Sequence, residues 1–435
     1  MDLKALNLPY ELRPYQVEGL KFLSNINHGL LADDMGLGKT IQAITALKLR
    51  FLSEGIFRCL IIVPNSLVSN WVKEFDTWFP EAPLTIIEGD AENRYILLER
   101  TRGFMIATYD QIRLAFGTNM NNTQKSRNEI KGFDLVLLDE AQKIKNANSQ
   151  TTLSCHLIRK EKSWLLTGTP LENSETDIIS VFSFLERKLI RKGMEVAEIR
   201  NTIAPYMLRR LKKDILSELP DLIEQDFYLE LTKEQNTEYQ NIYKDRELRN
   251  PLEVVTELKK ICNFSSDGHS VKLSRLKDIA EELESKGEKM LVFSQYVKTL
   301  ETINESLNGD NIFLFHGGLD KNQKDNILKN FKETNGHAVL LISLHAGSVG
   351  LNLQEASTVV LFDRWWNPAV ENQAIARAHR MGRTEPVHAI KFITSNTIEE
   401  KIDELLQDKS DLFEDVVEGA VELREKLKLR DLLEI

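Results

Sequence analysis

Residues 33–40 read DDMGLGKT, and regular apolar positions begin directly after them at Ile41 and Ile44. This is the pattern of a glycine-rich turn that opens a helix. Glycines let the backbone approach a phosphate closely, and the free N–H groups of a helix N-terminus favour an anion. In such a loop the lysine reaches the β- and γ-phosphates and the threonine hydroxyl binds Mg²⁺. The stretch therefore predicts a nucleoside triphosphate site, with Lys39 and Thr40 at the phosphates and the metal.

The loop departs from the strict pattern G-x-x-x-x-G-K-[ST], because Asp33 occupies the position of the first glycine. A chance Gly-Lys-Thr in an ordinary loop is therefore an open alternative. The prediction needs support from other parts of the chain.

Length and composition set the outer limits. The chain has 435 residues, enough for two large domains or three small ones, and its 42% hydrophobic and 28% charged residues are typical of a globular protein. No run approaches the length of a membrane span, and the first residues lack the apolar core of a signal peptide. Cys59, Cys155 and Cys262 are scattered and odd in number, which favours a reducing compartment and a cytoplasmic location. The net charge of −10 excludes general nucleic-acid affinity but allows a local basic groove.

Short apolar runs alternate with helical stretches in both halves of the chain. Such runs are typical of buried parallel strands, so an α/β fold with a parallel sheet is predicted. The runs lie at 59–64, 104–109, 135–142 and 165–170, and again at 290–296, 312–318, 339–344, 358–363 and 388–394. Between about 183 and 275 strand-like runs are scarce, and charged helical stretches dominate.

Four sets of polar residues are candidates for chemistry. Asp139 and Glu140 follow an apolar run, where the first acid would bind Mg²⁺ and the second would activate a water. Gln16 has an amide that could pair with adenine, although a solvated glutamine is the simpler interpretation. The remaining candidates are basic groups with open alternatives. Arg209, Arg210, Lys212 and Lys213 form either a solvated helix face or phosphate contacts, and Arg377, Arg380 and Arg383 share one face if their stretch is helical, as an ion-pair face or as nucleotide contacts.

Taken together, the ordered blocks resemble the Swi/Snf-type ATPases of helicase superfamily two. The resemblance runs from about residue 10 to about residue 405, and its clearest blocks are LRPYQVEGLKFL, LADDMGLGKT, LIIVPNSLVSNW, LVLLDEAQKIKN, LLTGTPLEN, MLRRLKKDI, LVFSQY and DRWWNPAVENQAIARAHRMGR. It implies two RecA-like parallel-sheet lobes with a helical insertion between them. Lobe 1 would span 1–222 with a helical protrusion from about 183, a helical insert and linker would span 223–275, and lobe 2 with C-terminal brace helices would span 276–435. Because no further module is recognisable, a minimal prokaryotic or viral member is expected.

The resemblance also implies roles for individual residues. The ATP-binding set is Arg13, Gln16, Asp34, Met35, Gly36, Leu37, Gly38, Lys39, Thr40, Gly350 and Gln373. The catalytic set is Lys39, Asp139, Glu140, Arg377 and Arg380, with the two arginines as fingers and with Thr40 and Asp139 on Mg²⁺. The DNA-facing set is Pro64, Asn65, Ser66, Thr108, Thr167, Gly168, Thr169, Ser294, Gln295, Ser343 and Trp366.

By this resemblance, the expected function is an ATP-dependent translocase on double-stranded DNA that hydrolyses ATP between two lobes and moves or displaces bound proteins without separating strands. A DNA-bound protein or RNA polymerase is the candidate target, and a monomer is expected. Two alternatives stay open: a strand-separating helicase of the same superfamily, and a non-hydrolysing scaffold that binds DNA or a polymerase. The sequence Asp-Glu-Ala-Gln at 139–142 and the ending Met-Gly-Arg at 381–383 depart from the more usual family blocks, which leaves the role of Arg383 open.

Overall fold

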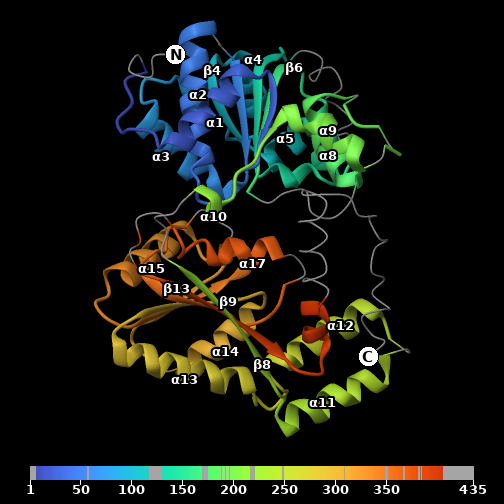
Figure 1. Ribbon diagram of the computed structural model, residues 1–435, viewed down its shortest axis with the longest axis vertical. Helices are drawn as coiled ribbons and strands as arrows, with labels where there is room; N and C mark the ends of the chain where they lie inside the picture. The colour runs from blue at the N-terminus through green and yellow to red at the C-terminus, as the bar shows by residue number, and fades with distance from the viewer. Residues whose placement is uncertain are drawn as a thin grey trace. The chain divides into compact units, whose positions relative to one another are not determined.

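The chain divides into two units between residues 217 and 218 (Figure 1). The computed structural model describes residues 6–55, 58–116, 130–168, 175–187, 189–191, 193–194, 196–215, 221–246, 249–307, 309–347, 351–365, 368–380, 383 and 385–404. Thr169, Gly350 and Trp366, which were predicted as site residues, lie outside these ranges, as do most of the polar loop at 117–132 and the tail from 405.

The first unit is built on a parallel sheet, in which seven strands are described. Their order across the sheet is β3 (Leu84–Ile86), β4 (Gly103–Thr108), β2 (Arg58–Val63), β5 (Phe133–Asp139), β6 (Lys160–Leu166), β1 (His28–Leu31) and β7 (Met207–Leu208). Every pairing is parallel, so the segments that follow β1, β2, β4, β5 and β6 all start at one edge of the sheet.

Helices cover both faces of this sheet (Figure 1), because alternate strand residues point to opposite sides. In β2, Cys59 and Ile61 pack with α1 (Pro14–Asn25), α2 (Lys39–Glu54) and α3 (Val68–Trp78). Leu60 and Ile62 pack on the other face. That face is covered by α4 (Ala91–Arg100), α5 (Tyr109–Phe116), α7 (Gln150–His156), α8 (Glu175–Leu185) and α9 (Val196–Ile203).

The second unit repeats this plan. Its sheet, six strands in the described residues, has the order β10 (Ile312–Phe315), β11 (Ala338–Ser343), β9 (Lys289–Ser294), β12 (Ala356–Leu361), β13 (Val387–Thr394) and β8 (Leu222–Leu229). All pairings are again parallel. One face carries α15 (Lys321–Glu333) and α17 (Pro368–Ile375), and the other carries α13 (Val271–Lys286) and α14 (Val297–Leu307). A separate cluster joins α11 (Lys233–Lys244) and α12 (Pro251–Asn263) to the helical residues 398–404.

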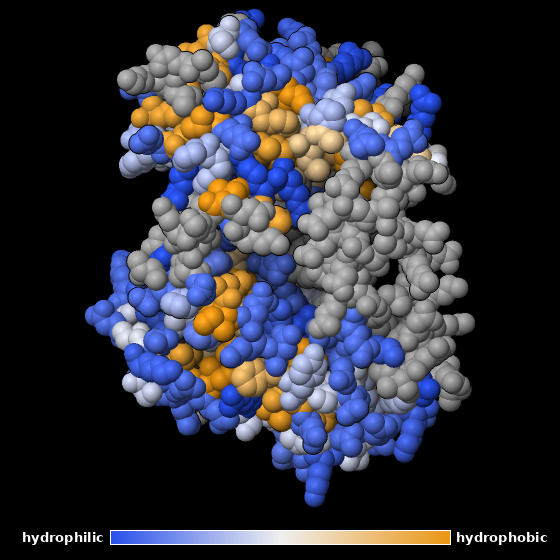
Figure 2. Space-filling view, in the orientation of Figure 1, coloured by the Kyte–Doolittle hydropathy of each residue, from blue (hydrophilic) through white to orange (hydrophobic). Residues whose placement is uncertain are grey.

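These sheets confirm the predicted α/β class with two parallel-sheet lobes. Hydrophilic residues cover most of the visible face of both units in Figure 2, with scattered hydrophobic patches. No helix in the described part of the chain is both long and apolar enough to cross a membrane.

Two local expectations are wrong. The segment 223–275 was expected to be a helical insert, but it begins within β8, whose eight residues pair in register with β13. β8 lies at the sheet edge and reads LIEQDFYL, with most residues exposed or half-buried, so it lacks the apolar run that marks a central strand. The basic stretch was expected to be helical from residue 207, whereas Met207–Leu208 is β7 and, in the part of this stretch that the structure describes, α10 begins at Lys212 and covers Lys212–Ile215. The assignment of the ranges 1–222, 223–275 and 276–435 to three parts stays a prediction.

Candidate nucleotide-binding site

The loop between β1 and α2 has the backbone of an anion site. Gly36 and Gly38 have φ values of +86° and +72°, a region that residues with a side chain adopt at a cost. Lys39 is the first residue of α2, and its cap residue Gly38 offers no side-chain oxygen to the N–H groups of the first turn. These donors and the helix dipole therefore favour a phosphate at this end of α2.

Lys39 bends back over its own loop. Its Nζ donates to the carbonyl oxygens of Asp33, at 2.7 Å, and Asp34, at 3.2 Å. Burial lowers the pKa of Lys39, while the carboxylates of Glu140, Asp33 and Asp139 oppose that shift. A Cβ atom on Gly168 would lie 3.1 Å from this Nζ, so the turn after β6 also closes on the lysine. Two carbonyl partners are weaker competitors than a triphosphate for an ammonium group.

Asp139 is held at the end of β5 by groups that the sequence analysis did not connect with it. Trp71 in α3 donates Nε1–H to Oδ2 at 2.7 Å, and the backbone N–H of Glu140 donates to Oδ1 at 2.9 Å. The hydroxyl of Tyr109 donates to the Asp139 carbonyl at 2.7 Å. Burial, and then the charge of Glu140, raise the pKa of Asp139 to about 7, while Trp71 and Lys39 act to lower it.

Glu140 has a left-handed backbone, with φ at +54°, which costs about 1–3 kcal/mol for a residue with a side chain. Gln142 contacts it through Nε2, which donates to Glu140 Oε2 at 2.7 Å. The other end of the same amide, Oε1, accepts from the Thr167 hydroxyl at 2.9 Å. The glutamine of the Asp-Glu-Ala-Gln variant thus joins the candidate general base to the end of β6.

These residues suit Mg²⁺. Mg²⁺ keeps several waters and is usually bound through one or two carboxylates and substrate phosphates. Thr40, next to Lys39 in the first turn of α2, and Asp139 at the end of β5 supply a hydroxyl and a carboxylate of the expected kind.

Asp33, which replaces the first glycine of the strict pattern, has a structural partner. Arg210 donates Nε to Oδ1 at 2.9 Å and Nη2 to Oδ2 at 2.5 Å, and the carboxylate is fully buried. The same guanidinium donates to Gln42 Oε1 at 2.8 Å and to Glu18 Oε2 at 3.1 Å. Burial opposes the charged form, but Asp33 and Glu18 together raise the pKa of Arg210.

Both interpretations offered for the basic stretch are therefore wrong for Arg210, which is neither solvated nor directed at a phosphate. Gly19 in α1 provides the space for the Arg210 contacts, since a Cβ atom there would lie 1.7 Å from Gln42 Oε1. Lys212 differs from Arg210: its Nζ would lie 3.3 Å from a Cβ on Gly36, beside the phosphate loop.

Gln16 is buried rather than solvated, which excludes the simpler interpretation of this residue. Its Oε1 accepts from the Arg13 backbone N–H at 3.0 Å in a capping box at the start of α1. Its Nε2 would lie 2.7 Å from a Cβ on Gly38, so the side chain packs directly on the phosphate loop. Adenine contact by Gln16 and Arg13 stays a prediction.

The predicted DNA-facing residues of the first unit follow β2, β4 and β6 at the same sheet edge. Asn65 is exposed, and Pro64 and Ser66 are half-buried. Thr108 is buried, and its Oγ1 accepts from the Gln111 backbone N–H at 3.2 Å.

In the second unit the hydroxyl of Ser294 is not available to DNA. Ser294 is fully buried and donates to Asp363 Oδ2, while the Gln295 backbone N–H donates to Asp363 Oδ1 at 3.0 Å. Ser343 is buried as well. Trp365 is partly buried and packs against the core of the unit.

The arginine-rich stretch does not form one helix face, so that expectation is wrong. α17 ends at Ile375, and the chain then makes tight turns in which the Arg377 N–H bonds to the Ala374 carbonyl at 3.1 Å. Arg377 is buried, Gln373 lies in α17, and the Arg380 Nε donates to the Ala376 carbonyl at 3.2 Å.

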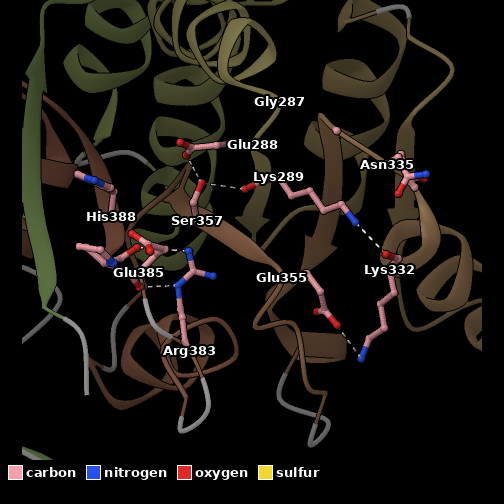
Figure 3. Close-up of a pocket in the computed structure, with 13 residues that line it drawn as sticks. Gly287, Glu288, Lys289, Lys332, Asn335, Glu355, Ser357, Arg383, Glu385 and His388 are labelled. Atoms are coloured by element: carbon pink, nitrogen blue, oxygen red, sulfur yellow. Dashed lines mark hydrogen bonds and ion pairs between the residues drawn. The ribbon is translucent and has the colours of Figure 1, made fainter. Parts of the chain in front are cut away.

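Arg383 has a separate structural role (Figure 3). Its guanidinium donates to the backbone carbonyls of Glu385, Gln354 and Pro386. It lines a pocket of about 590 Å³ beside the amino ends of β9, β12 and β13, away from the edge where the predicted site residues lie.

Comparisons with known proteins identify the family. The chain matches the SNF2-related domain family over residues 15–267 and the helicase conserved C-terminal domain family over residues 271–382. It is 31% identical to an uncharacterized ATP-dependent helicase of Mycoplasma pneumoniae, over 98% of this chain and 44% of the relative. It is 30% identical to YwqA of Bacillus subtilis, a candidate ATP-dependent helicase/translocase, over 94% of this chain and 49% of the relative. The chain thus spans a little under half the length of these relatives.

Among solved structures, the SWI2/SNF2 ATPase core of Sulfolobus solfataricus in complex with double-stranded DNA is similar, with 30% identity, 94% coverage of both chains and a TM-score of 0.46. The SNF2-related match alone takes in residues 15–267 of the 435. The chain belongs to the SNF2-related family.

Proposed function

We propose that this chain is an ATP-dependent motor that moves along double-stranded DNA without separating the strands. The observation that carries the proposal is the grouping of Lys39, Asp139 and Glu140 around a phosphate loop whose N–H donors have no side-chain cap. The membership of the SNF2-related family supports ATP as the substrate and Mg²⁺ as the metal.

In this mechanism Lys39 exchanges the carbonyls of Asp33 and Asp34 for the β- and γ-phosphates. Thr40 and Asp139 would hold Mg²⁺, which would supply positive charge at the transferring phosphoryl group. Glu140 accepts a proton from the attacking water, and the hydrogen bond from Gln142 fixes the direction of its carboxylate.

Arg377 and Arg380 of the second unit supply the remaining positive charge. ATP would favour association of the two lobes because its γ-phosphate gains these arginines, and hydrolysis would remove that preference. Alternating grip on the DNA backbone would then produce steps. Thr167 belongs to the predicted DNA-facing set and donates a hydrogen bond to Gln142, which in turn donates to Glu140. A DNA contact at Thr167 could therefore change the position of the general base.

Duplex DNA as the partner follows from the resemblance of the sequence blocks to Swi/Snf-type ATPases. The Sulfolobus core of that type was solved with double-stranded DNA bound, and the Bacillus relative bears the name of a helicase/translocase. The displaced target, a DNA-bound protein or RNA polymerase, belongs to the proposal. A monomeric state also belongs to the proposal. A cytoplasmic location belongs to it too, and the three buried, free cysteines support that location.

One experiment separates this function from its alternatives. ATP turnover is measured with no nucleic acid, single strands, duplex DNA and duplex RNA, with Lys39→Ala as the control that should abolish turnover. Stimulation by duplex DNA, with displacement of a triplex-forming strand and no release from a forked duplex, is expected. Stimulation by single strands with release of the labelled strand would instead indicate a strand-separating helicase, and DNA binding without turnover would indicate a scaffold.

Contacts mainly to phosphates carry no sequence information, so stimulation should be nearly independent of sequence. Each neutralised phosphate releases counterions, so the log–log salt dependence should have a slope of roughly −0.9 per contact.

A further inference from the structure

A pocket in the first unit is lined by several basic side chains. It lies at the edge of the sheet opposite the phosphate loop. It has a volume of about 360 Å³ and lies beside His28 and Lys160, the first residues of β1 and β6. Three further basic side chains line it: His156 from the end of α7, Arg159 before β6, and Arg187 after α8. Among the described lining residues there is no aspartate or glutamate.

Lys160 is the central cation of this pocket. Its Nζ lies 3.8 Å from the centroid of the Phe184 ring, and among the described residues no carboxylate forms an ion pair with it. Burial, followed by the charge of Arg187, lowers the pKa of Lys160 to about 8. Lys162, two residues along the same strand, differs in that its ammonium forms an ion pair with Glu54.

Burial is the main cause of the lowered pKa of both histidines in this pocket, and nearby cations add to it. Burial, then Lys160 and Arg187, lower the pKa of His156 to about 4. Burial and Lys160 also lower the pKa of His28, while Glu186 opposes that shift from the exposed rim. His28 keeps one ring nitrogen 2.9 Å from Ser163 Oγ. Lys160 therefore lies half-buried beside the exposed Arg159 and Arg187 with no carboxylate among the described lining residues, an arrangement that an entering anion would make more favourable.

We propose that this pocket binds a small phosphate-class oxyanion, either inorganic phosphate or pyrophosphate. Lys160 would act as a point charge and Arg187 as a planar donor that can bond two oxygens at once. The Phe184 ring lies under the Lys160 ammonium and helps to hold it in the pocket through a cation–π contact. The pocket volume suits a small ligand rather than a groove for a polymer.

This proposal does not depend on ATP turnover at the phosphate loop. The anion would bind at the amino ends of β1 and β6, whereas the phosphate loop follows the carboxyl end of β1. Occupancy should stabilise the first unit, because the anion offsets the charges of Lys160 and Arg187 and favours the protonated forms of His28 and His156.

The test uses the full chain with inorganic phosphate and with pyrophosphate, at constant ionic strength held with chloride. Binding is measured by equilibrium dialysis in a Lys39→Ala background, which weakens competition from the phosphate loop. NMR of labelled histidines follows the pKa of His156, which should rise from about 4 toward its ordinary value of 6.5 on saturation. Lys160→Met, which keeps contact with Phe184, should weaken binding about tenfold or more, since it removes a charge-assisted bond to the anion.

Lys162→Met is the matched control, because it removes a lysine from the same strand that already has a carboxylate partner. It should leave the affinity unchanged, and Lys160→Arg should restore most of it. In phosphate-free buffer Lys160→Met should melt at a higher temperature than the parent, whereas Lys162→Met should not. Equal weakening by both methionine variants, an unmoved His156 pKa, or competition by duplex DNA alone would overturn the proposal.

Discussion

The carboxyl edges of the two sheets carry polar side chains in similar places but use them differently. At the first edge, as far as the described residues go, Lys39 donates to backbone carbonyls alone, and Glu140 accepts from one amide and has a left-handed backbone. At the second edge Asp363 accepts from the Ser294 hydroxyl, from the Gln295 backbone and from Asn263 Nδ2 at 3.0 Å. The first arrangement leaves groups that can change partners, and the second is an internal network.

The network behind the second edge reaches far into the unit. Lys272 in α13 donates to Asn263 at 3.0 Å and to Glu399 at 2.6 Å, and both charged residues are fully buried. Lys259 donates to the Arg364 carbonyl at 2.8 Å. A buried pair of this kind persists only when its remaining donors and acceptors are satisfied. A polar residue after a strand is therefore either a reactive group or part of a buried structural network. Its hydrogen-bond partners in the core decide which of the two it is.

After Lys39→Ala, which should abolish turnover, the largest effect should come from Arg380, where the second unit is proposed to act on the nucleotide. Arg380→Ala should spare ATP binding and lower kcat about 10³-fold or more, as the loss of a supplied arginine finger does. Arg383→Ala is the matched control, because Arg383 bonds only to carbonyls around its own pocket in the described contacts. It should lower the melting temperature and keep the specific rate. The reverse pattern in the two variants would assign the finger to Arg383.

Glu140→Gln should have the next largest effect. The amide keeps the shape of the side chain but cannot accept a proton, so turnover should fall by about 10²–10⁴-fold while ATP still binds. Single-turnover hydrolysis and nucleotide affinity are measured on the same preparation. If a normally folded variant loses its affinity for ATP, Glu140 is a binding group and not the general base.

The sequence predicts most of the sheet because central parallel strands are continuous apolar runs. β2, β4, β5, β9, β11 and β12 contain such runs, β13 keeps a mainly apolar run despite His388 and Lys391, and the segments after these strands lie at the expected edge. β8 was missed because an edge strand needs no apolar run, and β3 and β7 because they have only three and two residues.

The support of the site was not predictable, because its partners are far apart in the chain. Arg210 and Asp33 are separated by 177 positions, and Trp71 and Asp139 by 68. Their local patterns, a basic stretch and a tryptophan in a helix, fit many environments. Gln142 is the exception, because Asp-Glu-Ala-Gln departs from the more usual family block and so indicated in the sequence that this position is different from that of many relatives.

If the second edge is an internal network, Lys272→Met should act on stability. Breaking a buried pair leaves Glu399 without its cation and costs about 3–5 kcal/mol. Lys286→Met on the same helix is the control, because Lys286 and its partner Glu282 are both exposed and their pair should contribute nothing measurable. Chemical unfolding of both variants provides the comparison. Similar unfolding midpoints for the two variants would show that the hydrogen-bond network at Lys272 does not stabilise the second unit.

The smallest effect should appear at Trp71, which supports the first edge without facing the substrate. Trp71→Phe keeps an aromatic ring at this position but removes the N–H donor to Asp139, so the pKa of Asp139 should rise above about 7. A proton on the carboxyl competes with Mg²⁺, so the variant should need more Mg²⁺ for half-maximal ATPase at pH 6.5. The difference should vanish near pH 9, where the carboxyl is ionised in both proteins.

Trp164→Phe is the control: Trp164 is equally buried in the same cluster, but its N–H donates to the Ile26 carbonyl at 3.1 Å. A several-fold increase in the Mg²⁺ requirement at low pH, confined to Trp71→Phe, is expected because the hydrogen bond contributes on the order of 1.5–3 kcal/mol to the charged form and part of that is recovered from water. A requirement that rises equally at every pH, or in both variants, would mean that Trp71 serves packing alone and that the first edge takes its charge balance from Lys39.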